Sequence, residues 1–508
     1  MDGFINCIFV KRVIILLGFW RSHADYQQQT ATALALIARS SPHELWEYER
    51  SISKLYILNL DPLKPIVAPL YSSTGRPSEN QPEIFRSLIL MNDLKLSLDE
   101  WVVKLSRNRV LQIACGFFGK LPGIASYYDF MHRIVKMEEK PRVKQKKRKS
   151  KKKYGKSKMP HKREGTVQML VNRILKGRRF NNRPERLLQE IFANVCVQPS
   201  IDMGLVPDAV CVSGDGTCIK TGASPYGRRT CSCKSFTCDC PRRFSDPNAS
   251  WGWDSHNERY FYGYTGYFIS TYNSTLKLDL PLYLRIVDAK RHDSISAVVA
   301  LAEFRDIYPG LAVEAFISDS ASDNYATYGL LDKWNIIAVI ALNSGKRGDF
   351  KYSKCLVNEN GVPLCPAGRE MVNWGYCPDR CRIKWRCPRA CGKCPSCDAC
   401  AICSPSPYGR VVYTKPEWDL RLFTRIPRGS DQFKALMRER TAAERVNNRI
   451  LHHYGLENSK VRGKKRISFF ATIAAFNTHL DAQLAKLKAD LLFDFATIFG
   501  LKCMEFAA

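Results

Sequence analysis

The sequence predicts an α/β protein in which a mixed sheet with flanking helices follows an all-helical N-terminal domain and is interrupted by a Cys-rich insertion. Three observations lead to this prediction. Strand-like runs alternate with helical runs between residues 208 and 342, helical periodicity dominates residues 45–135, and ten of the twenty cysteines lie between Cys355 and Cys403. The 508 residues are also enough for more than one folded unit.

The helical N-terminal domain is expected over residues 45–135. Apolar residues recur at helical spacing in Pro82–Ser97, and Leu98–Cys115 repeats the pattern. Residues 1–44 are interpreted as a tail of uncertain role. Their apolar run Val13–Trp20 is too short to span a bilayer and lacks a clear signal-peptide cleavage site. No other stretch has a transmembrane composition, so we expect no membrane partner.

The α/β core is expected to follow a helical connector over residues 166–204. Its first part covers residues 205–343, and its second part, with C-terminal helices, covers residues 432–508. Strand-like runs rich in β-branched and aromatic residues alternate with amphipathic runs in the first part. Residues 208–219 are expected to be β-rich and to contain a turn. Further strands are expected at residues 260–270, 280–288, 312–318 and 336–342, and helices at 296–308 and 324–334.

The charge balance favours a polyanionic partner. Lys and Arg number 78 against 48 Asp and Glu, a formal net charge of +30, which folding does not need and which repels itself. Nucleic acid would offset this charge, because phosphate contacts release counterions. Residues 136–165 are predicted to be a basic linker, since eight of the ten residues from Lys144 to Lys153 are Lys or Arg. The linker residues expected to contact DNA are Lys146, Lys147, Arg148 and Lys149.

Three carboxylates are candidates for a metal-dependent site. Asp215 lies in SGDGT and Asp319 in ISDSASDN, each at the end of a predicted strand, and Glu444 lies in the predicted helix RERTAAERVNNRI. Oxygen ligands of this kind suit Mg²⁺ or Mn²⁺, and two such ions can activate the attacking oxygen and stabilise the leaving oxygen in phosphoryl transfer. Alternatively, Asp215 shapes a Gly-Asp-Gly turn and Glu444 pairs with neighbouring arginines.

Several segments then point to one family. They are TGRPSENQPEIFRSLILMNDLKLSLDEWVVKLSRN in the helical region, GDGT at 214–217, SDSASDN at 318–324, and an Arg-x-x-x-Glu signature met by Arg440 and Glu444. With these segments, residues 45–480 resemble the bacterial insertion-sequence DDE transposases. The resemblance implies an RNase H-like core in which Asp215, Asp319 and Glu444 hold two Mg²⁺ or Mn²⁺ ions. It also implies that Arg440 lies near a DNA phosphate.

The sequence departs from the family signature at two positions beside Glu444. The related signature has a Tyr three residues before the Arg and a Lys seven residues after the Glu, where this chain has Met437 and Leu451. The auxiliary DNA contacts are therefore expected from Arg445, Arg449 or Lys460.

Two further carboxylates lie near the candidate site in the sequence. Asp323 competes with Asp319, and we prefer Asp319 because it directly follows the apolar strand. The pair His292–Asp293 either lines the site or belongs to a plain loop.

The Cys-rich insertion, residues 344–431, is predicted to bind metal. Its last five cysteines recur every third residue, and repeated C-x-x-C steps let two thiolates grip one tetrahedral ion. Structural Zn²⁺ is favoured, and an iron–sulfur cluster is the alternative. The metal is expected to fold an insertion that lacks its own apolar core. The predicted ligands, whose pairing stays open, are Cys377, Cys381, Cys387, Cys391, Cys394, Cys397, Cys400 and Cys403.

A second group of cysteines forms CSCKSFTCDC, with Cys231, Cys233, Cys238 and Cys240. C-x-C steps are less common at zinc sites, and metal binding and its absence are equally compatible with this spacing. The arginines on either side of the segment either contact DNA or form a solvated basic loop.

The resemblance implies a transposase that cleaves DNA at the ends of its element and joins the freed 3′-hydroxyl to a target. Double-stranded DNA is then the partner, a homodimer pairs the two ends, and the protein is cytoplasmic and nucleoid-associated when bound to DNA. A nuclease on the same fold, a non-catalytic zinc-containing DNA-binding protein and an inactive relic are the alternatives.

Overall fold

The computed structural model describes residues 17–72, 74–135, 140–144, 164–178, 184–234, 238–255, 257–343, 355–394, 396–397, 403–457 and 461–502. Lys146–Lys149, Cys400 and Lys460 lie outside the described residues. The chain divides into two compact units. The first comprises residues 1–138, 183–199 and 469–508, and the second comprises residues 139–182 and 200–468.

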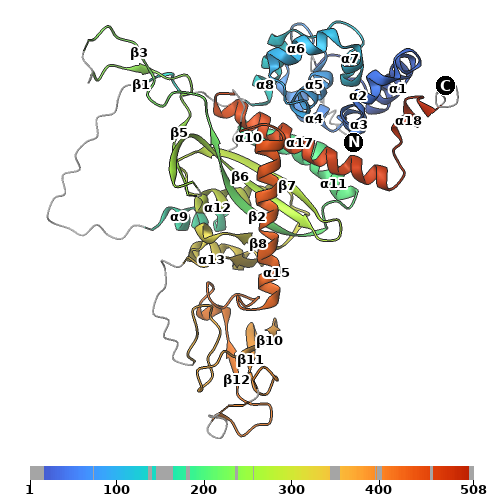
Figure 1. Cartoon of the computed structure of the whole chain (residues 1–508). Helices are drawn as coiled ribbons and strands as arrows, with labels where there is room; N and C mark the ends of the chain where they lie inside the picture. The colour runs from blue at the N-terminus through green and yellow to red at the C-terminus, as the bar shows by residue number, and fades with distance from the viewer. Residues whose placement is uncertain are drawn as a thin grey trace, which may run out of the picture. The chain divides into compact units, whose positions relative to one another are not determined.

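The first unit is built from helices, as the periodicity predicts (Figure 1). Its centre is apolar, and the indole of the buried Trp101 donates a hydrogen bond to Ser87 over 2.8 Å. Ser97 and Glu100 form a capping box that fixes where the helix beginning at Leu98 starts. The helices are α1 (His23–Ser40), α2 (Pro42–Glu47), α3 (Glu49–Ile57), α4 (Leu63–Val67), α5 (Gln81–Asp93), α6 (Leu98–Arg107), α7 (Arg109–Cys115), α8 (Ile124–Ile134), α10 (Pro184–Phe192) and α18 (Phe495–Ile498).

The two ends of the chain contribute more to this unit than the sequence indicates. Residues 1–44 were expected to form a tail, yet α1 belongs to the unit. The buried Tyr26 of α1 donates a hydrogen bond to the carbonyl of Ala114 over 2.6 Å. Residues 469–508 were expected to complete the α/β core, yet they also belong here. Phe476 of α17 (Lys464–Ala489) packs edge-on against Phe85, with 5.3 Å between ring centroids.

The second unit contains a mixed six-stranded sheet, which confirms the α/β class. Its strands run in the order β5-β6-β2-β8-β9, and β7 also pairs with β6. The central strand β2 is antiparallel to β6 and parallel to β8, which in turn is parallel to β9. The strands are β2 (Ala209–Lys220), β5 (Ser250–Asp254), β6 (Arg259–Asn273), β7 (Leu278–Asp288), β8 (Ala312–Ser318) and β9 (Ile337–Ile340).

Helices connect and cover this sheet. α12 (Asp293–Ile307) links β7 to β8, and α13 (Tyr325–Lys333) links β8 to β9. α9 (Thr166–Leu175) packs on both through an apolar cluster that includes Val171, Val298 and Leu330. After the insertion, α15 (Asp431–Glu439) packs on β8 and β9, and α16 (Thr441–Asn448) contacts β2, β6 and β7. α16 is therefore brought to the centre of the sheet.

The Cys-rich insertion has an apolar core of its own, contrary to expectation. Its antiparallel sheet contains β10 (Val372–Cys377), β11 (Arg382–Arg386) and β12 (Val411–Thr414). Ile383 and Trp385 of β11 are buried in a cluster with Met371 and Phe423. The sequence hides this core because its apolar residues are few, widely spaced and separated by polar loops.

The second cysteine group lies between two strands of a third, small sheet. It contains β1 (Val143–Lys144), β3 (Arg228–Arg229) and β4 (Arg242–Arg243), in the order β1-β4-β3. Separately, no helix among the described residues is both long and apolar enough to cross a membrane.

Candidate active site

The register of two neighbouring strands places Asp215 beside Asp319. β2 and β8 are parallel, and Ser213 of β2 pairs with Ile317 of β8. Asp215 lies two residues after Ser213, and Asp319 lies two residues after Ile317, in backbone that is still extended. Because alternate residues of a strand face the same side of a sheet, both carboxylates lie at the same level on one face.

The surroundings of Asp215 oppose its ionisation. Burial is the largest cause, and together with the nearby carboxylates of Asp319 and Asp293 it raises the pKa of Asp215 to about 7, although Arg440 acts in the opposite direction. Like charges held close together in a partly dry site disfavour the ionised forms. The site therefore has an excess of negative charge that a cation would offset.

Asp293 is a third acidic group in this cluster, and the sequence left its role open. It is the first residue of α12, where a carboxylate is favoured by the helix dipole. A Cβ atom added to Gly216 would lie 2.6 Å from its Oδ1, so the glycine beside Asp215 leaves room for this carboxylate. Burial, and then the charge of Asp319, raises the pKa of Asp293 to about 6.

α16 adds an amide to these acidic groups and carries a fourth carboxylate nearby. Asn447 donates a hydrogen bond from Nδ2 to Oδ2 of Asp215 over 2.9 Å. Glu444 lies three residues earlier, and residues at this spacing share one face of a helix. Glu444 is half-exposed and forms an ion pair with Arg440 at 2.6 Å. The sequence did not identify Asn447, although its spacing from Glu444 was a usable signal.

The donor set fits a hard divalent cation. Carboxylate oxygens are the ligands that Mg²⁺ and Mn²⁺ prefer. The buried Oδ1 of Asn447 has no hydrogen-bond partner among the described residues, so one more oxygen is available. The carboxylate oxygens of Asp215, Asp319 and Glu444 do not all lie within 4.8 Å of one another. Glu444, which is turned towards Arg440, would have to reorient to share an ion with the two aspartates.

Two of the predicted DNA-contacting arginines hold α16 against the sheet. Arg445 makes two hydrogen bonds of 2.6 Å to the carboxylate of Asp279 in β7. Arg449 donates to the same carboxylate at 3.0 Å and to the Asp279 carbonyl at 2.8 Å. The side chain of Asp279 is only 3% exposed, so these arginines satisfy a buried charge.

The competing Asp323 has a structural environment. Its carboxylate is fully buried and accepts two hydrogen bonds from Arg421, at 2.8 and 2.7 Å, and one from the backbone of Asn343 at 2.7 Å. Asp319, in contrast, accepts one from the backbone of Ala321 and keeps its carboxylate near Asp215. Arg421 therefore pairs with Asp323, and the role of Asp319 as a metal ligand stays a prediction.

The two cysteine groups differ in how closely their sulfurs approach. In the described part of the insertion, no three of the predicted ligands have sulfurs within 4.8 Å of one another, and their shared metal stays a prediction. The sulfurs of Cys231, Cys238 and Cys240, in contrast, all lie within 4.8 Å of one another.

Asp215 was expected at the end of a strand, or in a Gly-Asp-Gly turn, yet it lies inside the continuous strand β2, whereas Asp319 directly follows the end of β8. Fold and site together define an α/β protein with acidic side chains gathered on two neighbouring strands, an arrangement suited to cation-assisted phosphoryl transfer. Residues 364–480 match a family model described as a transposase DDE domain. The match includes Glu444, Arg440 and Asn447, whereas Asp215 and Asp319 precede it. A search of curated proteins gave no match.

Proposed function

We propose that this protein is the DNA transposase of an insertion sequence, with Asp215, Asp319 and Glu444 as the ligands of two Mg²⁺ or Mn²⁺ ions. The observation that carries the proposal is the strand register that sets Asp215 beside Asp319, under a helix bearing Glu444. The transposase DDE domain over residues 364–480 supports the same activity. The mixed sheet with helices between its strands supports an RNase H-like core.

The chain's own residues would position the reacting groups. Asn447 orients the Asp215 carboxylate through its hydrogen bond. Arg440, which is near Asp215 and paired with Glu444, is placed to balance the charge of a DNA phosphate. The ions, when bound, would activate the attacking oxygen and stabilise the leaving oxygen at phosphorus. Arg445 and Arg449 both pair with Asp279 and stay partly exposed. Only the exposed part of each side chain would contact DNA.

The proposal also names the partners. The net charge of +30 supports binding to double-stranded DNA, both the ends of the element and the target. Two ends must be joined to one target, so we expect a homodimer that assembles on DNA in the cytoplasm.

A plasmid that carries the gene with its native flanking DNA provides the substrate for a test. In the presence of Mg²⁺ or Mn²⁺, the wild-type protein should cleave at the element ends and join them to new sites. Asp215→Asn should reduce the rates of both steps by more than about 100-fold. Loss of a residue that only orients a metal ligand usually costs about 10–100-fold, and loss of the ligand itself should cost more. Glu314→Gln is the matched control, since Glu314 lies exposed on β8 and should leave the rate unchanged.

The products separate this proposal from the alternatives. Cleavage without joined products would identify a nuclease on the same fold. If Asp215→Asn left DNA processing at the wild-type level, the triad would not be the active site. A non-catalytic DNA-binding protein would then be the better description.

A further inference from the structure

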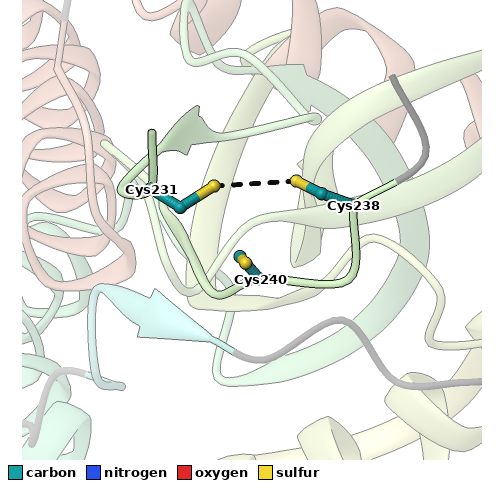
Figure 2. A group of neighbouring side chains, drawn as sticks. All are labelled: Cys231, Cys238 and Cys240. Carbon is teal, nitrogen blue, oxygen red and sulfur yellow. Dashed lines mark hydrogen bonds between the residues drawn. The ribbon is translucent and has the colours of Figure 1, made fainter. Parts of the chain in front are cut away.

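The four cysteines between β3 and β4 form two pairs, and the two sulfurs within each pair face each other. The sulfurs of Cys231 and Cys238 are 3.7 Å apart, and those of Cys233 and Cys240 are 3.6 Å apart. Figure 2 shows Cys231 and Cys238 pointing towards each other, with Cys240 beside them. All four are free thiols.

These two separations match those of a tetrahedral thiolate site, and the sulfurs of Cys231, Cys238 and Cys240 all lie within 4.8 Å of one another. The Cys233 sulfur is more than 4.8 Å from at least one of these three, so it would move closer to complete the site. Zinc–sulfur bonds measure about 2.3 Å, so two ligands on a tetrahedral ion lie about 3.8 Å apart. Each C-x-C step supplies one sulfur to each facing pair, so the two steps can enclose a single ion. Thiolate ligands favour Zn²⁺ over the hard cations that suit the carboxylate cluster.

The strands next to the cysteines cannot easily hold themselves together. Arg228 pairs directly with Arg243, and Arg229 with Arg242, across strands of only two residues. Like charges directly opposite each other destabilise a strand pair, and such short ribbons are marginal in water. The third strand, β1, also pairs with β4, but it sets Lys144 opposite Arg242 and so adds another positive charge. A negatively charged group at the cysteines would therefore stabilise this sheet.

We propose that Cys231, Cys233, Cys238 and Cys240 bind one structural Zn²⁺ ion that closes the β3–β4 ribbon. Four thiolates around one Zn²⁺ ion carry a net charge of about −2, which offsets the repulsion between the flanking arginines. The bound ion would also supply folding free energy to this ribbon, because its exposed arginines leave little apolar surface to bury. The site is independent of the carboxylate cluster, so it does not rest on the proposed transposase activity.

The test measures zinc bound to the full-length protein purified under reducing conditions. The double variant Cys231→Ser/Cys238→Ser should contain about one zinc ion per chain fewer than the wild type. The control Ser232→Ala changes an exposed residue between two of the ligands and should keep the wild-type zinc content. Because the zinc content of each variant is compared with that of the wild type, any zinc bound by the Cys-rich insertion cancels out. An unchanged zinc content in the double variant would overturn the proposal.

A second measurement uses only the wild-type protein, in case the double variant fails to fold. The four thiols should react slowly with an alkylating reagent while zinc is bound, and at least about tenfold faster after chelation, with each site read by peptide mass spectrometry. Equal rates before and after chelation at these four positions would also overturn the proposal.

Discussion

The side chains around Asp215 form a cluster in which negative charge is only partly balanced. Asp319 and Asp293 both raise the pKa of Asp215, while Arg440 lowers it. Asn447 is the neutral member, with its amide nitrogen on Asp215 and its buried Oδ1 free of hydrogen-bond partners among the described residues. The cluster therefore surrounds Asp215, and the hydrogen bond from Asn447 links Asp215 to α16.

Asn447→Ala tests this role. Loss of the hydrogen bond would let the Asp215 carboxylate rotate, so the Mg²⁺ concentration for half-maximal cleavage should rise by about 10–100-fold, as is usual for groups that orient a ligand. Cleavage rates measured over a Mg²⁺ titration give this value. Asn448→Ala is the control, because the neighbouring Asn448 is exposed. An unchanged Mg²⁺ dependence in Asn447→Ala would contradict the role.

α16 depends on a buried anchor for its place on the sheet. Asp279 of β7 receives hydrogen bonds from both Arg445 and Arg449, which lie one turn apart on the same side of the helical segment. Removal of one partner from a buried ion pair leaves the other charges uncompensated. The position of Glu444 and Asn447 over the strands is therefore coupled to a residue outside the cluster.

Asp279→Ala should loosen α16. We expect the local unfolding free energy, measured by hydrogen exchange of residues 441–448, to fall by about 1–3 kcal/mol, less than for a fully buried pair because Arg445 is partly exposed. DNA cleavage should fall with it. Asp288→Ala, on the same strand, is the control, since its pair with Lys140 is longer, at 3.6 Å, and partly exposed, and should matter little. Unchanged exchange in Asp279→Ala would show that packing alone holds the helix.

Over the whole molecule, the positive charge is the most general determinant of binding. The net charge of +30 predicts an affinity for DNA that falls steeply with salt. Part of that charge lies on the ribbon around the second cysteine group, where Arg228 and Arg243 are exposed. The ribbon is therefore a candidate contact with the DNA backbone.

Arg228→Gln/Arg243→Gln should reduce the slope of log affinity against log salt concentration by about two, about one for each lost phosphate contact. Fluorescence anisotropy with a labelled duplex at several salt concentrations measures this slope. The control Arg39→Gln/Lys64→Gln removes two exposed charges from the helical unit and should leave it unchanged. Equal slopes in the ribbon variant and the wild type would exclude the ribbon as a DNA contact.

The sequence by itself determined the class of the fold and most of its elements. The strand expected at residues 312–318 is β8, and the helix expected at 324–334 is α13 (Tyr325–Lys333). It also placed Asp319 directly after a strand, as β8 shows, whereas Asp215, expected at a strand end, lies inside β2. These features depend on local periodicity and on residues next to each other in the chain, which a linear pattern records.

Only the tertiary structure decided which distant residues meet. It set Asp215 and Asp319 at one level through the β2–β8 register, and it added Asn447 and Asp293 to the cluster. It also gave the insertion an apolar core and brought the C-terminal residues 469–508 into the helical unit. Strand pairing and core packing join segments far apart in the chain, and no local pattern specifies those partners.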